Sequence, residues 1–78
     1  MPGATELLRR ITVHPDRMHG RPCIRGLRIT VGDVLGMLAA GMSREAILRD
    51  YPYLETADID AALVFAAEQA DHPVIAAE

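Results

Sequence analysis

The chain has 78 residues and a formal net charge of −3, and half of its residues are apolar. Such a chain is too apolar to be disordered and fits one domain, near the size at which a hydrophobic core only just suffices, so we expect self-association. Its single cysteine, Cys23, excludes an internal disulfide. With no signal peptide and no long apolar run, the sequence favours a cytoplasmic protein without a membrane segment.

The charges are unevenly distributed along the chain. Residues 1–28 hold six arginines against two carboxylates, whereas residues 29–78 hold two arginines against nine carboxylates. Opposite signs at the two ends favour head-to-tail self-association or two different partner surfaces. All eight cationic side chains are arginines, which suit bidentate pairing with carboxylates or phosphates better than lysines do.

The N-terminal part predicts a lead-in over residues 1–10, loose or helical, and a β element over residues 11–30. The β element begins with a short β-prone run and continues as a tight turn between two apolar arms. Gly26 supplies the positive φ that the reversal needs, and Ile24 and Ile29 lie on the two arms.

From residue 31 the apolar period changes from two to about 3.6. A first helix is expected over residues 31–40, with Thr30 as its N-cap and Gly41 in a left-handed conformation at its C-terminal end. Ser43 then caps a second helix, which ends before a proline.

A third helix is expected over residues 57–70, with Thr56 as its N-cap. Its segment 61–67 is apolar on every side, whereas a surface helix of a monomer shows one apolar stripe, so another element or a second copy should cover it. Residues 71–78 form a short tail. The whole chain, 1–78, is one domain.

The expected fold is mostly α, with a short N-terminal β element and a three-helix domain of the helix-turn-helix type over residues 31–70. The competing interpretation is a three-helix core that reads no DNA. The third helix would be the reader, but it opens with Asp58 and Asp60, and carboxylates beside phosphates disfavour major-groove binding.

Three arginines fall within eight residues with no acid between them. They are the solvated rim of the hairpin or a contact for an anion or a partner. The candidate cations for binding a partner or nucleic acid are Arg21, Arg25, Arg28 and Arg44. The candidate apolar contacts for a partner or a second copy are Val64, Phe65, Val74 and Ile75.

The sequence offers no catalytic or metal-binding constellation. His14, His19 and Cys23 lack the fourth ligand of a structural zinc site. Asp58 and Asp60 are two residues apart on a helix and therefore point to different faces, which disfavours an acid–base pair. We therefore expect no enzyme, no cofactor and no metal.

The order of these signals is similar to that of the domain-of-unknown-function 433 family. The residues that carry the resemblance are HP at 14–15, GRPCIRGLRI at 20–29, LAAGMS at 38–43, YPYL at 51–54 and DIDAAL at 58–63. Two positions depart from the family pattern: Leu27, where Thr is usual, and Thr30, where Pro is frequent. Neither departure disturbs the expected fold.

The resemblance implies a homeodomain-like fold and a VapB-like antitoxin that neutralises a PIN-like ribonuclease toxin. A further hypothesis is that the protein binds operator DNA and represses its own operon. The alternative is a DNA-binding transcriptional regulator of the helix-turn-helix type. In the antitoxin hypothesis, an arginine such as Arg25 pairs with the carboxylates of the nuclease site; in the rival hypothesis, Arg25 only fixes the hairpin.

Overall fold

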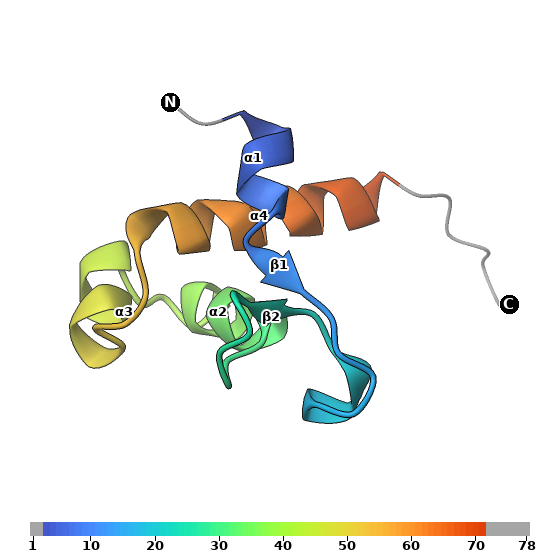
Figure 1. Ribbon diagram of the computed structural model, residues 1–78. Coiled ribbons are helices and arrows are strands. Elements are labelled where there is room, and N and C mark those ends of the chain that lie inside the picture. Colours follow the sequence, from blue (N-terminus) through green and yellow to red (C-terminus); the bar gives the residue numbers. More distant parts are fainter. Residues whose placement is uncertain (1–2, 72–78) are drawn as a thin grey trace, which may run out of the picture.

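The structure is a computed structural model that describes residues 3–71, so Val74, Ile75 and the rest of the tail lie outside the described residues. The described part is mostly helical, with a two-stranded sheet near the N-terminus, as expected (Figure 1). The lead-in contains a helix of its own. The elements are α1 (Ala4–Leu8), β1 (Ile11–Thr12), the 3₁₀ turn η1 (Met18–Gly20), β2 (Cys23–Ile24), α2 (Val31–Ala39), α3 (Arg44–Asp50) and α4 (Thr56–Ala70).

The β element is organised by a two-residue turn after β2. Arg25 and Gly26 both have positive φ, 47° and 70°, as in a type I′ turn, and the Leu27 N–H donates to the Ile24 carbonyl at 2.7 Å. The Ile24 N–H in turn donates to the Ile29 carbonyl, so the predicted turn and its two arms are confirmed. On its other side, β2 pairs antiparallel with β1.

The predicted boundaries of α2 and α3 follow from local chemistry. Thr30 and Asp33 form a reciprocal capping box at the start of α2, and Gly41 has φ 93° after its end. Ser43 accepts a hydrogen bond from the Ala46 N–H at 3.1 Å and so caps α3. These three predicted terminal residues are confirmed.

The predicted N-cap of α4 was wrong by one residue. Glu55, not Thr56, is the N-cap, and its backbone N–H donates to the Asp58 carboxylate at 2.8 Å. Because the carboxylate at the third helical position satisfies this N–H, the helix begins one residue earlier than expected.

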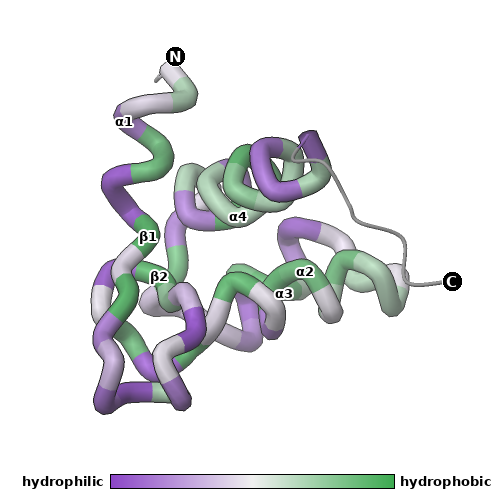
Figure 2. The backbone as a smooth tube through the Cα atoms, turned by 90° about the vertical axis from the view of Figure 1, so that its right-hand side faces the viewer, coloured by the Kyte–Doolittle hydropathy of each residue, from purple (hydrophilic) through white to green (hydrophobic). Residues whose placement is uncertain are grey.

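Helix α4 crosses the molecule, in contact with α1 as well as with α2 and α3 (Figures 1 and 2). The apolar segment of α4 is thus covered in part by the chain itself. Ala61 and Ala62 are fully buried, Val64 and Phe65 are half-buried, and Leu63 is 40% exposed. The helix gradually leaves the core toward its C-terminal end.

The hydrophobic core lies where the turn, α2, α3 and the first half of α4 meet. Both arms of the turn contribute to it, through Ile24 and Ile29. Figure 2 shows that hydrophobic residues occur along α2 and α4. The buried core cluster consists of Ile24, Ile29, Val31, Val34, Ile47, Leu54, Ile59 and Ala62.

None of the helices among residues 3–71 combines the length and the apolar composition needed to cross a membrane.

Candidate functional site

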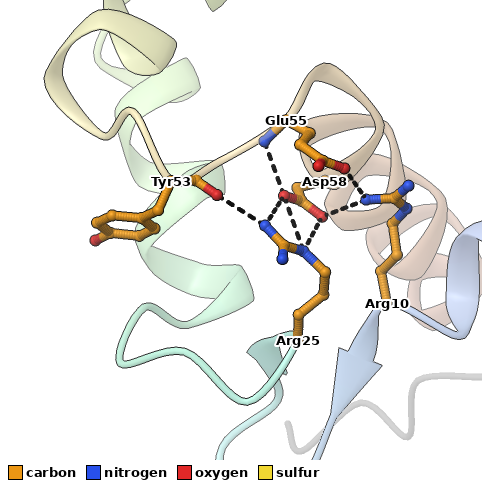
Figure 3. Close-up of polar contacts among 5 residues, drawn as sticks. All are labelled: Arg10, Arg25, Tyr53, Glu55 and Asp58. Atoms are coloured by element: carbon orange, nitrogen blue, oxygen red, sulfur yellow. Dashed lines mark hydrogen bonds and ion pairs between the residues drawn. The ribbon is translucent and has the colours of Figure 1, made fainter.

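Arg25 does not extend into solvent but reaches back to the start of α4. Its Nε and Nη2 atoms donate to the Asp58 carboxylate at 3.0 Å and 2.9 Å, a bidentate pair, and Nη2 also donates to the Tyr53 carbonyl at 2.8 Å (Figure 3). The left-handed backbone of the turn aims the side chain in this direction. Arg25 therefore ties the β element to the segment between α3 and α4.

A second arginine completes this polar network. Arg10, just before β1, donates from Nη1 to Asp58 at 3.0 Å and to Glu55 at 2.7 Å (Figure 3). The Asp58 side chain is 0% exposed, whereas the two arginine side chains are about one-third exposed, at 31% and 35%. We call Arg10, Arg25, Glu55 and Asp58 the Asp58 network.

The Asp58 carboxylate is held in its charged form despite its burial. Burial alone would raise the pKa of Asp58, but hydrogen bonds from Arg25, from the Glu55 backbone N–H and from Arg10 outweigh it and lower the pKa below its ordinary value. Hydrogen bonds to the carboxylates of Glu55 and Asp58 raise the pKa of Arg10, and the hydrogen bonds to Asp58 raise the pKa of Arg25. A buried, fully paired charge of this kind is a structural element, since all of its acceptor sites are occupied.

The four arginines that the sequence singled out are not brought together. Arg25 belongs to the Asp58 network, and Arg44 forms an ion pair with Asp60 of α4 at 2.7 Å. Within residues 3–71, no ion pair engages Arg21 or Arg28. These two arginines lie beside two different clefts.

Arg21 lies beside an apolar groove between α2 and α4. The groove has a volume of about 380 Å³, and its floor and walls come from both helices and from the segment before β2. Arg21 and Phe65, one from each of the two sets of predicted contact residues, meet here. Its lining residues are Arg21, Pro22, Val31, Gly32, Leu35, Phe65, Ala66 and Gln69.

Arg28 lies beside a cleft of about 340 Å³ that no sequence pattern indicated. This cleft is lined by Arg28, Ile29, Asp33, Met37, Tyr51 and Tyr53. The two tyrosine rings meet edge to face, with centroids 6.1 Å apart and planes at 84°. The sequence analysis gave neither tyrosine a binding role, although the Tyr-x-Tyr pair that follows the second helix could have indicated one.

The cysteine and the histidines do not form a metal centre. Cys23 is buried and its thiol lies 3.3 Å from the Arg21 carbonyl, to which it donates. Among residues 3–71, no three side chains of His, Cys, Asp or Glu gather as a set of metal ligands. The burial of Cys23 is that of a small hydrophobic residue at a strand.

The comparisons place the chain in a family. The profile of the family described as "Protein of unknown function (DUF433)" matches residues 11–66, a span that includes the turn, all three longer helices up to the middle of α4, and both clefts in large part. This chain belongs to that family.

A relative from Sinorhizobium fredii (strain NBRC 101917 / NGR234), called "Uncharacterized protein y4eO", is 39% identical over 56 residues. The aligned part is 72% of this chain but only 25% of the relative, so the chain spans about a quarter of the length of that protein. No solved structure gives a significant match.

Proposed function

We propose that this protein is a non-enzymatic, antitoxin-like binding protein that engages a PIN-like ribonuclease through the groove between α2 and α4. The observation that carries the proposal is the meeting of an apolar groove and an arginine that has no ion-pair partner among residues 3–71. Arg21 supplies a cation beside side chains that are almost entirely apolar, among them Leu35 and Phe65. An interface is dominated by a few buried apolar anchors, with an arginine fixing orientation.

The geometry also revises which arginine would contact the nuclease. A PIN-like nuclease holds metal with a carboxylate cluster, and an arginine can pair with such carboxylates bidentately. Arg25 is already paired with Asp58, so its use would leave a buried carboxylate with one partner fewer. Arg21 has no such commitment within the described residues and is the better donor.

We further infer that α2, α3 and α4 form a homeodomain-like helix-turn-helix arrangement and that the protein acts as a homodimer. The short α2–α3 connection at Gly41 and the packing of both helices on α4 support the first point. The partly exposed apolar side chains of α4, with Leu63 the most exposed, support the second. Binding of operator DNA remains the rival activity.

Co-expression with the product of the adjacent gene, which the proposal expects to be a PIN-like ribonuclease, tests this proposal. Phe65→Ser and Arg21→Glu should each weaken co-purification and restore ribonuclease activity, while the circular dichroism spectrum stays that of a folded protein. Arg9→Glu is the matched control, since it makes the same charge change at an exposed arginine away from the groove. Full inhibition by both groove variants would refute the proposal, as would equal loss with Arg9→Glu.

A further inference from the structure

The cleft beside Arg28 lies on the opposite side of α2 from the α2–α4 groove. Asp33 and Met37 of α2 line the cleft, whereas Val31 and Leu35 line the groove. Successive residues of an α-helix are about 100° apart, so positions 31 and 33 point in nearly opposite directions. A ligand in the cleft would therefore leave the groove free, and a binding site here is independent of the function proposed for the groove.

The cleft shares a cationic residue, Arg28, with a smaller pocket that contains a second arginine. Arg28 lines the cleft and also a smaller adjoining pocket of about 140 Å³, where Arg17 from the loop before η1 lies as well. Arg17 is held there by a hydrogen bond from Nη1 to the Gly26 carbonyl at 3.4 Å. Because Arg28 lines both, we call the pocket and the cleft together the strip, which has the tyrosines at one end and Arg17 at the other.

The backbone at this end of the strip is unusual. Met18 and His19 have φ of 48° and 58°, values that residues with a Cβ rarely adopt, and Gly20 follows with 74°. Such a run costs energy and persists only where the surroundings impose it, and these conformations cluster at binding sites. Here the run presents Arg17 beside the pocket.

The segment that carries Tyr53, at the other end of the strip, is fixed in place. The carbonyl of Tyr53 accepts the hydrogen bond from Arg25 at 2.8 Å, so the Asp58 network anchors the segment that carries the ring. Tyr53 is 50% exposed, and its ring stands at 84° to that of Tyr51. An exposed ring on an anchored segment can stack with a planar ligand at little cost in ordering.

Two carboxylates, Asp33 and Asp16, also line the strip. Oδ2 of Asp33 accepts the Thr30 N–H at 3.0 Å as part of the α2 cap, which leaves its other oxygen as an acceptor in the cleft. Asp16 lines the small pocket beside Arg17. A purely anionic ligand would be opposed by both acids. A ligand that joins a phosphate to a planar ring with an amino group matches the two arginines, the Tyr53 ring and Asp33. Asp16 lies at the phosphate end of the strip, where the two arginines outnumber it.

We propose that this cleft binds one nucleotide of a single-stranded nucleic acid, with an amino-bearing base stacked on Tyr53 and its phosphate between Arg17 and Arg28. The exocyclic amino group would donate to Asp33, as cytosine N4 does to carboxylates. Stacking on an aromatic ring beside a cationic path is how proteins hold unpaired bases. A base inside a duplex cannot enter a cleft of this kind, so the ligand is single-stranded.

Fluorescence anisotropy with 5′-labelled dodecamers tests the inference at about 50 mM salt, where phosphate contacts are strong. We expect the deoxycytidine dodecamer to bind about fivefold or more tightly than the thymidine dodecamer, because one good base contact gives discrimination of at least that order. A cytidine ribododecamer shows whether RNA or DNA is preferred. A duplex that binds as tightly as the single strand, equal binding of the two DNA strands, or no binding would overturn the inference.

Three variants localise the binding. Tyr53→Ala should weaken it by about fivefold or more, while Tyr53→Phe, which keeps the ring, stays within about twofold of the parent. Arg28→Ala should weaken binding and lower the slope of log K against log salt by about one. Arg9→Ala removes the same charge outside the cleft. If it weakens binding as much as Arg28→Ala does, the nucleic acid binds the arginine-rich N-terminal part without a specific site, and the cleft is not the binding site.

The two tyrosines of the chain provide a second, independent measurement of binding in the cleft. The chain has two tyrosines and no tryptophan, and both tyrosines line the cleft. Ring proton resonances of Tyr51 and Tyr53 should shift on titration with deoxycytidine monophosphate, as expected for a stacked base. Binding of the dodecamer without any shift of these resonances would place the nucleic acid elsewhere on the protein and refute the site.

Discussion

The two halves of α4 have opposite relations to the rest of the molecule. In the first half, Asp58 is fully buried and every charge beside it is paired within the chain. In the second half, Leu63 and Phe65 remain partly exposed, and Arg21, which lines the same groove as Phe65, has no ion-pair partner among residues 3–71. The charged groups of the first half thus stabilise the fold, whereas apolar side chains of the second half remain available for binding. Charge alone does not mark a binding surface.

Removing the buried carboxylate should have the largest effect. Asp58→Asn leaves Arg10 and Arg25 without their shared anion, and breaking a buried ion pair costs about 3–5 kcal/mol. For a domain of this size that corresponds to a fall in melting temperature of at least about 12 °C. Thermal unfolding followed by circular dichroism measures it.

The matched control for Asp58→Asn lies two residues along the same helix. Asp60 pairs with Arg44 at 2.7 Å but is 37% exposed. Asp60→Asn should therefore cost about 1 kcal/mol or less, the value of an exposed ion pair. If the two variants unfold at the same temperature, the burial of Asp58 does not explain its contribution to stability.

Losing one of the two arginines should have a smaller effect than losing the carboxylate. In Arg25→Ala, Asp58 keeps Arg10, and Arg25 is itself about one-third exposed, so we expect a cost of about 2–3 kcal/mol, below the range for a fully buried pair. Urea unfolding gives the value. Arg21→Ala, which removes an arginine outside the network, should leave the midpoint unchanged within error; an equal loss in both variants would contradict the assignment of Arg25 to the fold.

Lowering the pH should remove the contribution of Asp58 to the free energy of unfolding. Because the pKa of Asp58 is lowered in the folded state, its contribution to stability is present above the unfolded pKa of about 3.9 and is lost as the pH falls through the lower folded value. Between pH 7 and 5, Asp58 should add no slope to the free energy of unfolding. Below about pH 4, stability should fall more steeply in the parent protein than in Asp58→Asn, and parallel curves would disprove the linkage.

A change in the second half of α4 should affect assembly more than stability. Leu63→Glu puts a charge on the most exposed apolar side chain of this helix, and we expect the melting temperature to change by only a few degrees. Sedimentation equilibrium should show a dimer in the parent protein and a monomer in the variant. A parent protein that sediments only as an 8.5 kDa species would remove the dimer proposal.

What the sequence predicted correctly depends on neighbouring residues. The caps at Thr30 and Ser43, the left-handed Gly41 and the turn at Gly26 all follow from interactions within a few residues. Their physical basis is local, so a single sequence contains it. The same locality explains why the helix bounds were correct to about one residue.

What the sequence missed depends on distant residues. Asp58 looked like a favourable charge in the first turn of a helix, which is true of many exposed aspartates. Its partners, Arg10 and Arg25, lie 48 and 33 residues away, and no spacing rule connects such positions. Arg25 was therefore counted among the available cations, whereas Arg21, in the same cluster, lies beside the groove. Only the folded arrangement separates the two.

The Asp58 network also constrains how this sequence can change over time. Replacing Asp58 leaves two arginines without their shared partner, and replacing either arginine leaves the buried carboxylate with one partner fewer. Replacing Arg10, Arg25 and Asp58 together by apolar residues of similar volume, in contrast, can be neutral. A lineage must therefore cross an unstable intermediate to lose the network. The matched family region includes Arg25 and Asp58 and begins one residue after Arg10. Among relatives, these positions should be inherited as a set, and descendants should differ more freely at Arg21.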